Sequence, residues 1–167
     1  MQTLPVTAYL SLGSNLDDRA ANIEMAVQQL VAFGRVAARS SLYETEPMEM
    51  KEQPWFLNCA IALETSVTPQ QLLNAALLIE QNMGRKRLVP KGPRIIDIDL
   101  LFFGELVESS ADLTLPHPAL HRRRFVLEPL AEIAPNFRHP VLNKTVRQLL
   151  ESLPPDGAVH NYQPSPS

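Results

Sequence analysis

Cysteine is almost absent from this sequence, since one residue of 167, Cys59, carries a thiol. A single thiol cannot close an internal disulfide, and it excludes zinc sites that are built on several cysteines. Long apolar runs are also missing, because no segment approaches the roughly 18 apolar residues that a membrane span requires. The first residues lack the basic segment of a secretory signal. We therefore expect a cytoplasmic protein that does not contact a membrane.

Positive charge is in slight deficit, with 15 Lys and Arg against 18 Asp and Glu, so the net charge is −3. This balance argues against a nucleic-acid-binding protein, whose affinity depends on many contacts from Lys and Arg to phosphates. The cations that are present are nevertheless concentrated. Eight of them occupy two short segments: Arg85, Lys86, Arg87, Lys91 and Arg94, and then Arg122, Arg123 and Arg124. A mildly acidic chain with two cationic segments suits a compact anionic ligand.

The hydrophobic pattern predicts one domain over residues 1–153, followed by a flexible, proline-rich tail over residues 154–167. Runs of apolar and β-branched residues bounded by turn residues predict four strands. These strands are "VTAYLSL", "RVAARSSLYET", "FLNCAIALET" and "IIDIDLLFF".

Two amphipathic helices are predicted between these strands, in "NIEMAVQQLV" and in "TPQQLLNAALLIEQNMG". The second begins with a threonine N-cap, a proline and the glutamine of a capping box. The resulting order, βαββαβ, is that of the α+β ferredoxin-like fold, in which an antiparallel sheet carries its helices on one face. We also predict a C-terminal hairpin in "GELVESSADLTLP" and helices in "FVLEPLAEIAP" and "TVRQLLESL".

Two carboxylates, Asp97 and Asp99, interrupt the last predicted strand. Side chains alternate along a strand, so the two acids share a face and lie about 7 Å apart. A solvent-facing strand surface is the simple alternative, but Ile95, Leu101 and Phe103 are expected on the same face. Neighbouring anions beside apolar surface repel each other and lose hydration, so they need a cation. Two hard oxygen donors without adjacent histidine indicate Mg²⁺.

The cations that precede this strand are candidate phosphate-binding groups. Arg94 comes immediately before the strand, and Arg85, Arg87 and Lys91 lie on a loop that can close over a polyphosphate. Taken alone, a run of charge on a loop is more often a solvated surface. Together with the two acids, it favours metal-assisted phosphoryl transfer.

A flat, polar-edged ligand is suggested by the strand "FLNCAIALET". Phe56 and Asn58 are two residues apart and share a face, which places a ring for stacking beside an amide that both donates and accepts hydrogen bonds. This pair suits a planar heterocycle. A core phenylalanine and a strand-end asparagine remain the simpler interpretation of two residues alone. His117 lies between two prolines and so on a rigid loop.

Several ordered motifs together resemble the 6-hydroxymethyl-7,8-dihydropterin pyrophosphokinase family of folate synthesis. The motifs are "YLSLGSNL", "YETEP", "QPWFLNCAIALET", "GPRIIDIDLLFFG" and "LTLPHPALHRRRFVLEPL". The resemblance implies an enzyme that transfers the β,γ-diphosphate of ATP to the hydroxymethyl group of the pterin, releases AMP and uses two Mg²⁺ ions. It also implies small-molecule partners only, and we expect a monomer.

The resemblance further implies roles for individual residues. Asp97 and Asp99 would bind the metal, and Arg85 and Arg94 would join them in the chemical step. ATP contacts would come from Glu80, Arg87, Lys91, Arg94, Leu100, Thr114, His117 and Arg123. Pterin contacts would come from Thr45, Met48, Phe56, Asn58, Asp97 and Phe125.

Two other function classes fit the predicted architecture. A ferredoxin-like domain can be a nucleic-acid-binding module, although the aromatic-rich strand and the positive charge of such a module are missing. A non-catalytic nucleotide-binding regulator would bind the same ligands without chemistry. Formation of AMP distinguishes the enzyme from both alternatives.

Overall fold

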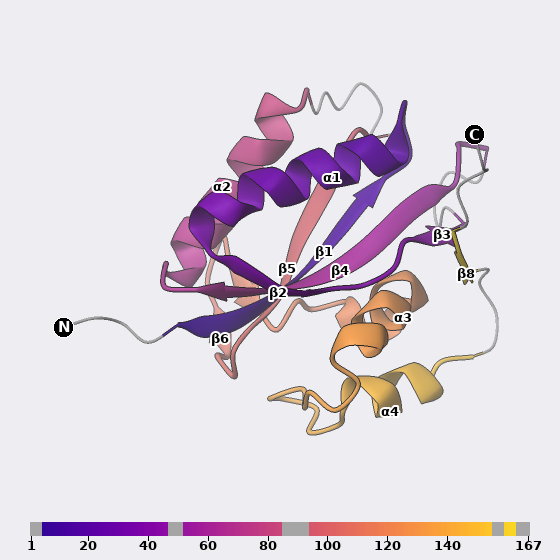
Figure 1. The fold of residues 1–167 in the computed structure, drawn as a ribbon. Coiled ribbons are helices and arrows are strands. Elements are labelled where there is room, and N and C mark those ends of the chain that lie inside the picture. Colours follow the sequence, from indigo (N-terminus) through magenta and orange to yellow (C-terminus); the bar gives the residue numbers. More distant parts are fainter. Residues whose placement is uncertain (1–4, 47–51, 85–93, 155–158, 163–167) are drawn as a thin grey trace.

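The computed structural model describes residues 5–46, 52–84, 94–154 and 159–162 (Figure 1). Six strands form an antiparallel sheet in the order β5-β1-β4-β3-β8, and β2 also pairs with β4. Their bounds are Val6–Ser14 (β1), Arg35–Arg39 (β2), Tyr43–Thr45 (β3), Phe56–Thr65 (β4), Asp97–Phe103 (β5) and Val159–Asn161 (β8). Helix α1 follows β1 and helix α2 follows β4, which confirms the βαββαβ order and the ferredoxin-like fold.

Helices α1 (Arg19–Leu30) and α2 (Pro69–Asn82) cover one face of the sheet (Figure 1). The carboxylate of Asp18 caps the first turn of α1, and Thr68 begins α2 with the predicted capping box. Apolar side chains of both helices and of the central strands form the first core. Cys59 is fully buried in this core, and its burial raises the pKa of the thiol to about 12.

Helices α3 (Arg124–Ile133) and α4 (Val146–Glu151) lie on the opposite face (Figure 1). Their apolar side chains pack on Ala60 and Phe102 and form the second core. The expectation of helices on one face therefore holds for α1 and α2 but not for the C-terminal helices. Helix α3 carries an apolar stripe that has to be buried, and the second face of the sheet offers the surface for it.

The remaining elements are short. Strands β6 (Glu108–Ser109) and β7 (Thr114–Leu115) pair with each other and form the predicted hairpin. Val31–Phe33 and Leu120–Arg122 form 3-10 turns. Over the described part of the chain, no helix combines the length and apolar character that crossing a membrane requires.

The predicted strand "RVAARSSLYET" is divided into β2 and β3, and both pair with β4. Ser40 lies at the division. Its backbone N–H donates to the carbonyl oxygen of Ala60 at 2.9 Å, and its hydroxyl accepts from the N–H of Ala60 at 2.9 Å. A side-chain oxygen thus takes the place of a backbone carbonyl in the ladder, and this competition interrupts the strand.

Part of the segment predicted to be a flexible tail forms strand β8. This strand pairs with β3, with His160 opposite Glu44, and the N–H of Tyr162 donates to the carbonyl of Leu42 at 2.8 Å. Pairing with β8 satisfies backbone groups along the outer side of β3. The limit of the domain at residue 153 stays a prediction.

A bulge between β5 and β1 changes which residues share a face with the two acids. The pairing shifts by one residue between Tyr9 and Leu10, so Leu101 reaches the second core whereas Phe103 reaches the first. Leu101 shares the face of the acids as predicted. Phe103 and Ile95 pack with the first core, so the prediction was wrong for these two side chains.

Candidate active site

The two acids of β5 lie in register with polar residues on neighbouring strands. Asp97 is opposite Gly13 of β1, Gly13 is opposite Asn58 of β4, and Asn58 is opposite Tyr43 of β3. Directly paired residues point to the same face of an antiparallel sheet. This is the face that packs with the second core, because the residues that alternate with the acids belong to the first. Asp99 lies one row further along the same face. We call Asp97, Gly13, Asn58 and Tyr43, together with Asp99, the polar row.

Asn58 is held in one orientation at the centre of the polar row. Its Nδ2 donates to Oγ1 of Thr45 at 2.6 Å, and both residues are almost fully buried. Its Oδ1 lies over Gly13, where a Cβ atom would stand only 2.5 Å from it. Phe56 and Asn58 share one face, as their spacing predicts, and Thr45 shares it because Thr45 is opposite Phe56. A glycine is therefore required beneath the amide.

Arg94 provides a cation for the acidic end of the row. Its Nη1 lies 2.9 Å from Oδ2 of Asp97, and the two side chains are 22% and 20% exposed. The backbone of Arg94 is fixed by Asn15, whose Oδ1 accepts from the N–H of Arg94 at 2.7 Å. This ion pair offsets the repulsion that two neighbouring carboxylates would otherwise have.

His117 is attached to β5 from the loop that follows β7. Its backbone N–H donates to the carbonyl of Leu101 at 2.9 Å, and its Nδ1 accepts from the N–H of Ala119 at 3.2 Å. Burial lowers the pKa of His117, while the charge of Asp99 opposes this effect and that of Arg123 adds to it. With Nδ1 accepting, the neutral ring carries its proton on Nε2, which can donate to an anionic ligand.

Arg123 and Phe125 lie at the start of α3, which packs against β4. The guanidinium carbon of Arg123 is 5.7 Å from the centre of the Phe125 ring, and the ring is partly buried at the edge of the second core. Both residues therefore belong to the layer that covers the face of the polar row.

Three of the residues predicted to contact ATP lie elsewhere. Glu80 is 4% exposed on α2, and its carboxylate accepts from the N–H of Ile98 at 2.8 Å. The side chain of Leu100 is buried in the first core, so both point away from the face of the polar row. Thr114 is exposed on β7. The ATP contacts of these residues stay predictions.

Four predicted site residues lie outside the described residues. They are Met48, Arg85, Arg87 and Lys91. Their proposed contacts with the pterin and with ATP stay predictions.

The sequence did not identify Gly13, Asn15 and Tyr43 as residues of the site or its support. Asn15 is fully buried although it is polar. Tyr43 donates to the Oε1 of Glu132 at 2.6 Å, and burial together with this bond raises the pKa of its hydroxyl. The signal was present in "GSN", a glycine and two small polar residues at a strand end, but residues on separate segments become partners only when the chain folds.

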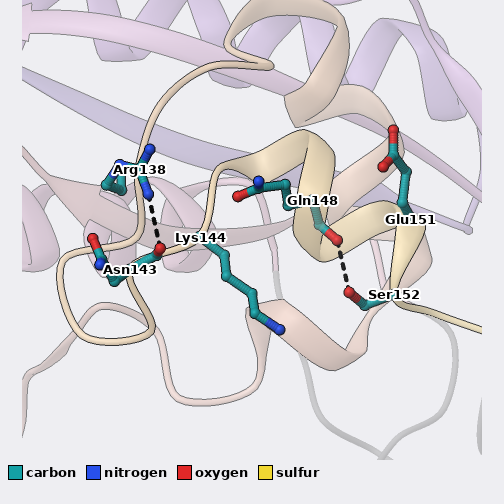
Figure 2. A pocket seen from close by; sticks show the side chains of 6 residues that line it. All are labelled: Arg138, Asn143, Lys144, Gln148, Glu151 and Ser152. Atoms are coloured by element: carbon teal, nitrogen blue, oxygen red, sulfur yellow. Dashed lines mark hydrogen bonds between the residues drawn. The ribbon is translucent and has the colours of Figure 1, made fainter.

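A separate hollow of about 400 Å³ lies beside α4. Figure 2 shows the residues that line it: Arg138, Asn143, Lys144, Gln148, Glu151 and Ser152. A guanidinium nitrogen of Arg138 donates to the backbone oxygen of Asn143 at 2.8 Å, and the hydroxyl of Ser152 donates to the backbone oxygen of Gln148 at 2.8 Å. The hollow shares no residue with the polar row, and these two hydrogen bonds lie within the local turn and helix α4.

Comparison with known proteins shows which family the sequence matches. The family model described as 7,8-dihydro-6-hydroxymethylpterin-pyrophosphokinase matches residues 9–135. A 2-amino-4-hydroxy-6-hydroxymethyldihydropteridine pyrophosphokinase of Methylorubrum extorquens is 47% identical over 90% of this chain and 95% of its own length. The folic acid synthesis protein FOL1 of Dictyostelium discoideum is 40% identical over 95% of this chain. The chain spans only 24% of that relative's length.

Solved structures agree on the fold. The Plasmodium falciparum HPPK-DHPS structure with pteroate has a TM-score of 0.71 at 20% identity, over 90% of this chain and 43% of that one. A triple mutant of the same protein gives a TM-score of 0.72 at 20% identity. At this identity, the likeness concerns the fold.

Proposed function

This chain belongs to the 7,8-dihydro-6-hydroxymethylpterin-pyrophosphokinase family, and from this premise we propose that it is an ATP-dependent diphosphotransferase of folate synthesis. The hydroxymethyl oxygen of 6-hydroxymethyl-7,8-dihydropterin attacks the β-phosphorus of ATP, and the bond between the α,β-bridging oxygen and that phosphorus breaks. The hydroxyl proton leaves to solvent or to a base, and AMP departs. The pterin keeps the diphosphate.

The polar row is the observation that carries this proposal. It places Asp97 and Asn58 on one face, with Gly13 between them. Neighbouring strands are about 4.8 Å apart, so the two residues are separated by about 10 Å. A phosphate group held at one end and a pterin ring held at the other would therefore bring their reacting atoms together over Gly13.

The residues at the acidic end fit Mg²⁺. Asp97 and Asp99 offer two hard oxygen donors on one face, and Mg²⁺ is commonly held by one or two carboxylates together with substrate phosphates and water. The described residues contain no cluster of three or more His, Cys, Asp or Glu able to hold a metal. A Mg²⁺ site that is completed by substrate phosphates and water does not need such a cluster. We propose that the two acids hold two Mg²⁺ ions, which when bound would neutralise charge on the transferred phosphates.

The other end of the row fits a pterin. Asn58 presents an amide fixed by Thr45, so it can read the donor and acceptor edge of the ring without reorienting. Phe56, on the same face, and Phe125, at the start of α3, would supply the two stacking surfaces. Met48 and Asp97 complete the proposed pterin contacts.

Cationic and donor groups would position the polyphosphate. Arg94 stands beside Asp97, and the Nε2–H of neutral His117 can donate to a phosphate oxygen. Arg94 and Arg85 are the proposed arginines of the chemical step. The further proposed ATP contacts are Glu80, Arg87, Lys91, Leu100, Thr114 and Arg123. We also propose that the protein acts as a cytoplasmic monomer, which light scattering and fractionation can test.

The decisive experiment mixes the protein with ATP, Mg²⁺ and the pterin alcohol. We expect one AMP for each pterin diphosphate, identified by chromatography and mass, and no product without the pterin or with a chelator. Binding of both substrates without AMP would instead support the non-catalytic nucleotide-binding regulator.

A further inference from the structure

Asn15 connects the two ends of the site through hydrogen bonds. It follows β1 directly, and it is fully buried. Its hydrogen bonds reach two segments that are distant in the sequence, one before β5 and one before β4. We propose that Asn15 is a positioning residue through which nucleotide binding and pterin binding influence each other. This inference rests on the proposed function.

The first connection is to the phosphate end. The Oδ1 of Asn15 accepts from the N–H of Arg94 at 2.7 Å, and the N–H of Asn15 donates to the carbonyl of Arg94 at 3.1 Å. Arg94 in turn contacts Asp97 through its guanidinium. This reciprocal pair of bonds fixes the backbone from which both the arginine and the acidic strand begin.

The second connection is to the pterin end. The Nδ2 of Asn15 donates to Oε1 of Gln53 at 2.8 Å and to the carbonyl of Pro54 at 3.0 Å. Pro54 comes two residues before Phe56, the proposed stacking ring. The single carboxamide therefore uses its oxygen for one end of the site and its nitrogen for the other.

This arrangement can transmit binding because the amide is rigid and has no contact with water. A buried polar group whose bonds are all made resists displacement, since losing one bond leaves a desolvated partner. If ATP holds the backbone of Arg94 in its productive position, the bonds of Asn15 hold residues 53–54 in place as well, so part of their ordering is already complete when the pterin arrives. Coupling of this kind is reciprocal for the two ligands.

The test measures the dissociation constant of the pterin alcohol by calorimetry, with and without Mg²⁺ and a non-hydrolysable ATP analogue. The ratio of the two constants is the coupling factor. For the wild type we expect a factor of about fivefold or more. Asn15→Ala removes the side-chain bonds to both segments and keeps the backbone bond to the carbonyl of Arg94. For this variant we expect a factor close to one.

Asn22 provides a matched control. Its Nδ2 donates to Oγ of Ser14 at 3.2 Å and to the carbonyl of Leu16 at 2.9 Å, so Asn22→Ala removes similar bonds from the same turn and touches neither connection. We expect it to keep the wild-type coupling factor. Gln53→Ala removes one bond of the second connection from a partly exposed residue, and it should give an intermediate factor even if Asn15→Ala does not fold.

The outcomes separate the two proposals. An unchanged coupling factor in Asn15→Ala, or in Gln53→Ala when the first variant is unfolded, overturns the role of Asn15. Equal loss of coupling in Asn22→Ala also overturns it, as does a wild type whose ligands bind independently. A wild type that binds neither ligand instead overturns the proposed function.

Discussion

The two ends of the polar row hold their polar groups in different ways. At the end proposed for the pterin, Asn58 and Thr45 are neutral, almost fully buried and bonded to each other. At the end proposed for the phosphates, Arg94 and Asp97 carry full charges and keep about a fifth of their side chains exposed. A buried neutral bond fixes one orientation, whereas a partly open ion pair can exchange partners when a metal or a phosphate arrives. The amide at the end proposed for the pterin is therefore preformed, and the end proposed for the phosphates would be completed by its ligands.

The largest effect should come from removing an acid at the phosphate end. Asp97→Asn and Asp99→Asn take away a proposed metal ligand, so we expect turnover to fall on the order of a thousandfold. The fold should persist, because Asp99→Asn removes one of two neighbouring like charges and Asp97→Asn keeps a side-chain oxygen that can accept from Arg94. Turnover at several Mg²⁺ concentrations and thermal unfolding measure the two effects.

Glu105 provides the control for these variants, since it is an exposed acid in the turn after β5. Glu105→Gln likewise replaces a carboxylate by an amide, outside the polar row, and should keep wild-type turnover. Wild-type activity in both Asp97→Asn and Asp99→Asn would contradict the proposal that these acids hold the metal, and with it the difference drawn between the two ends.

The next effect concerns the preformed end. Gly13→Ala places a Cβ atom 2.5 Å from Oδ1 of Asn58, and the strain of such overpacking costs about 1–3 kcal/mol. We expect pterin affinity to fall by roughly tenfold and nucleotide affinity to change much less. Calorimetry with each ligand measures this difference.

A second substitution sharpens that test. Asn58→Ala in the Gly13→Ala background removes an amide that is already displaced, so it should lower pterin affinity little further. Additive losses would show that Gly13 does not act through Asn58.

Removing a proposed stacking ring should have a similar or smaller effect. Phe56→Ala and Phe125→Ala should each weaken pterin binding by about 1–3 kcal/mol, by analogy with stacking of nucleobases on aromatic rings. Nucleotide affinity should change less. A larger loss of nucleotide affinity in titrations of either variant would mean that the two ends are assigned in the wrong order.

The smallest effect is on stability in mild acid. Burial lowers the pKa of His117, with Asp99 opposing and Arg123 adding to the shift. The folded state therefore disfavours the proton, and the contribution of His117 to the free energy of unfolding is lost as pH falls below the unfolded pKa of about 6.5. Between about pH 7 and about pH 5, urea unfolding should show a steeper loss for wild type than for His117→Gln. Parallel curves would contradict this.

Local sequence signals predicted the scaffold well. The capping box at Thr68, the helical spacing after Asp18 and the alternation in β4 are each set by neighbouring residues, so a single segment suffices to predict them. The shared face of Phe56 and Asn58 follows from alternation as well. The same reasoning predicted the α+β order and the two acids on one face.

Features that depend on two segments were not predicted. The bulge that turns Phe103 away from the acids arises from pairing with β1, and the break at Ser40 depends on Ala60. The contact between Gly13 and Asn58 and the bonds of Asn15 join residues from different strands and loops. The residue pattern of one segment carries no information on its partners in another segment. Such contacts were therefore not predicted, either in the scaffold or in the site.

The burial of Cys59 makes this chain well suited to spectroscopic labelling. Its thiol is fully buried, and the raised pKa keeps it protonated at neutral pH, whereas alkylating reagents react with the exposed thiolate. The sequence contains no other cysteine. A cysteine introduced on an exposed position such as Thr114 would therefore be modified selectively, so a single fluorophore or spin label could report on nucleotide binding without first replacing a native residue.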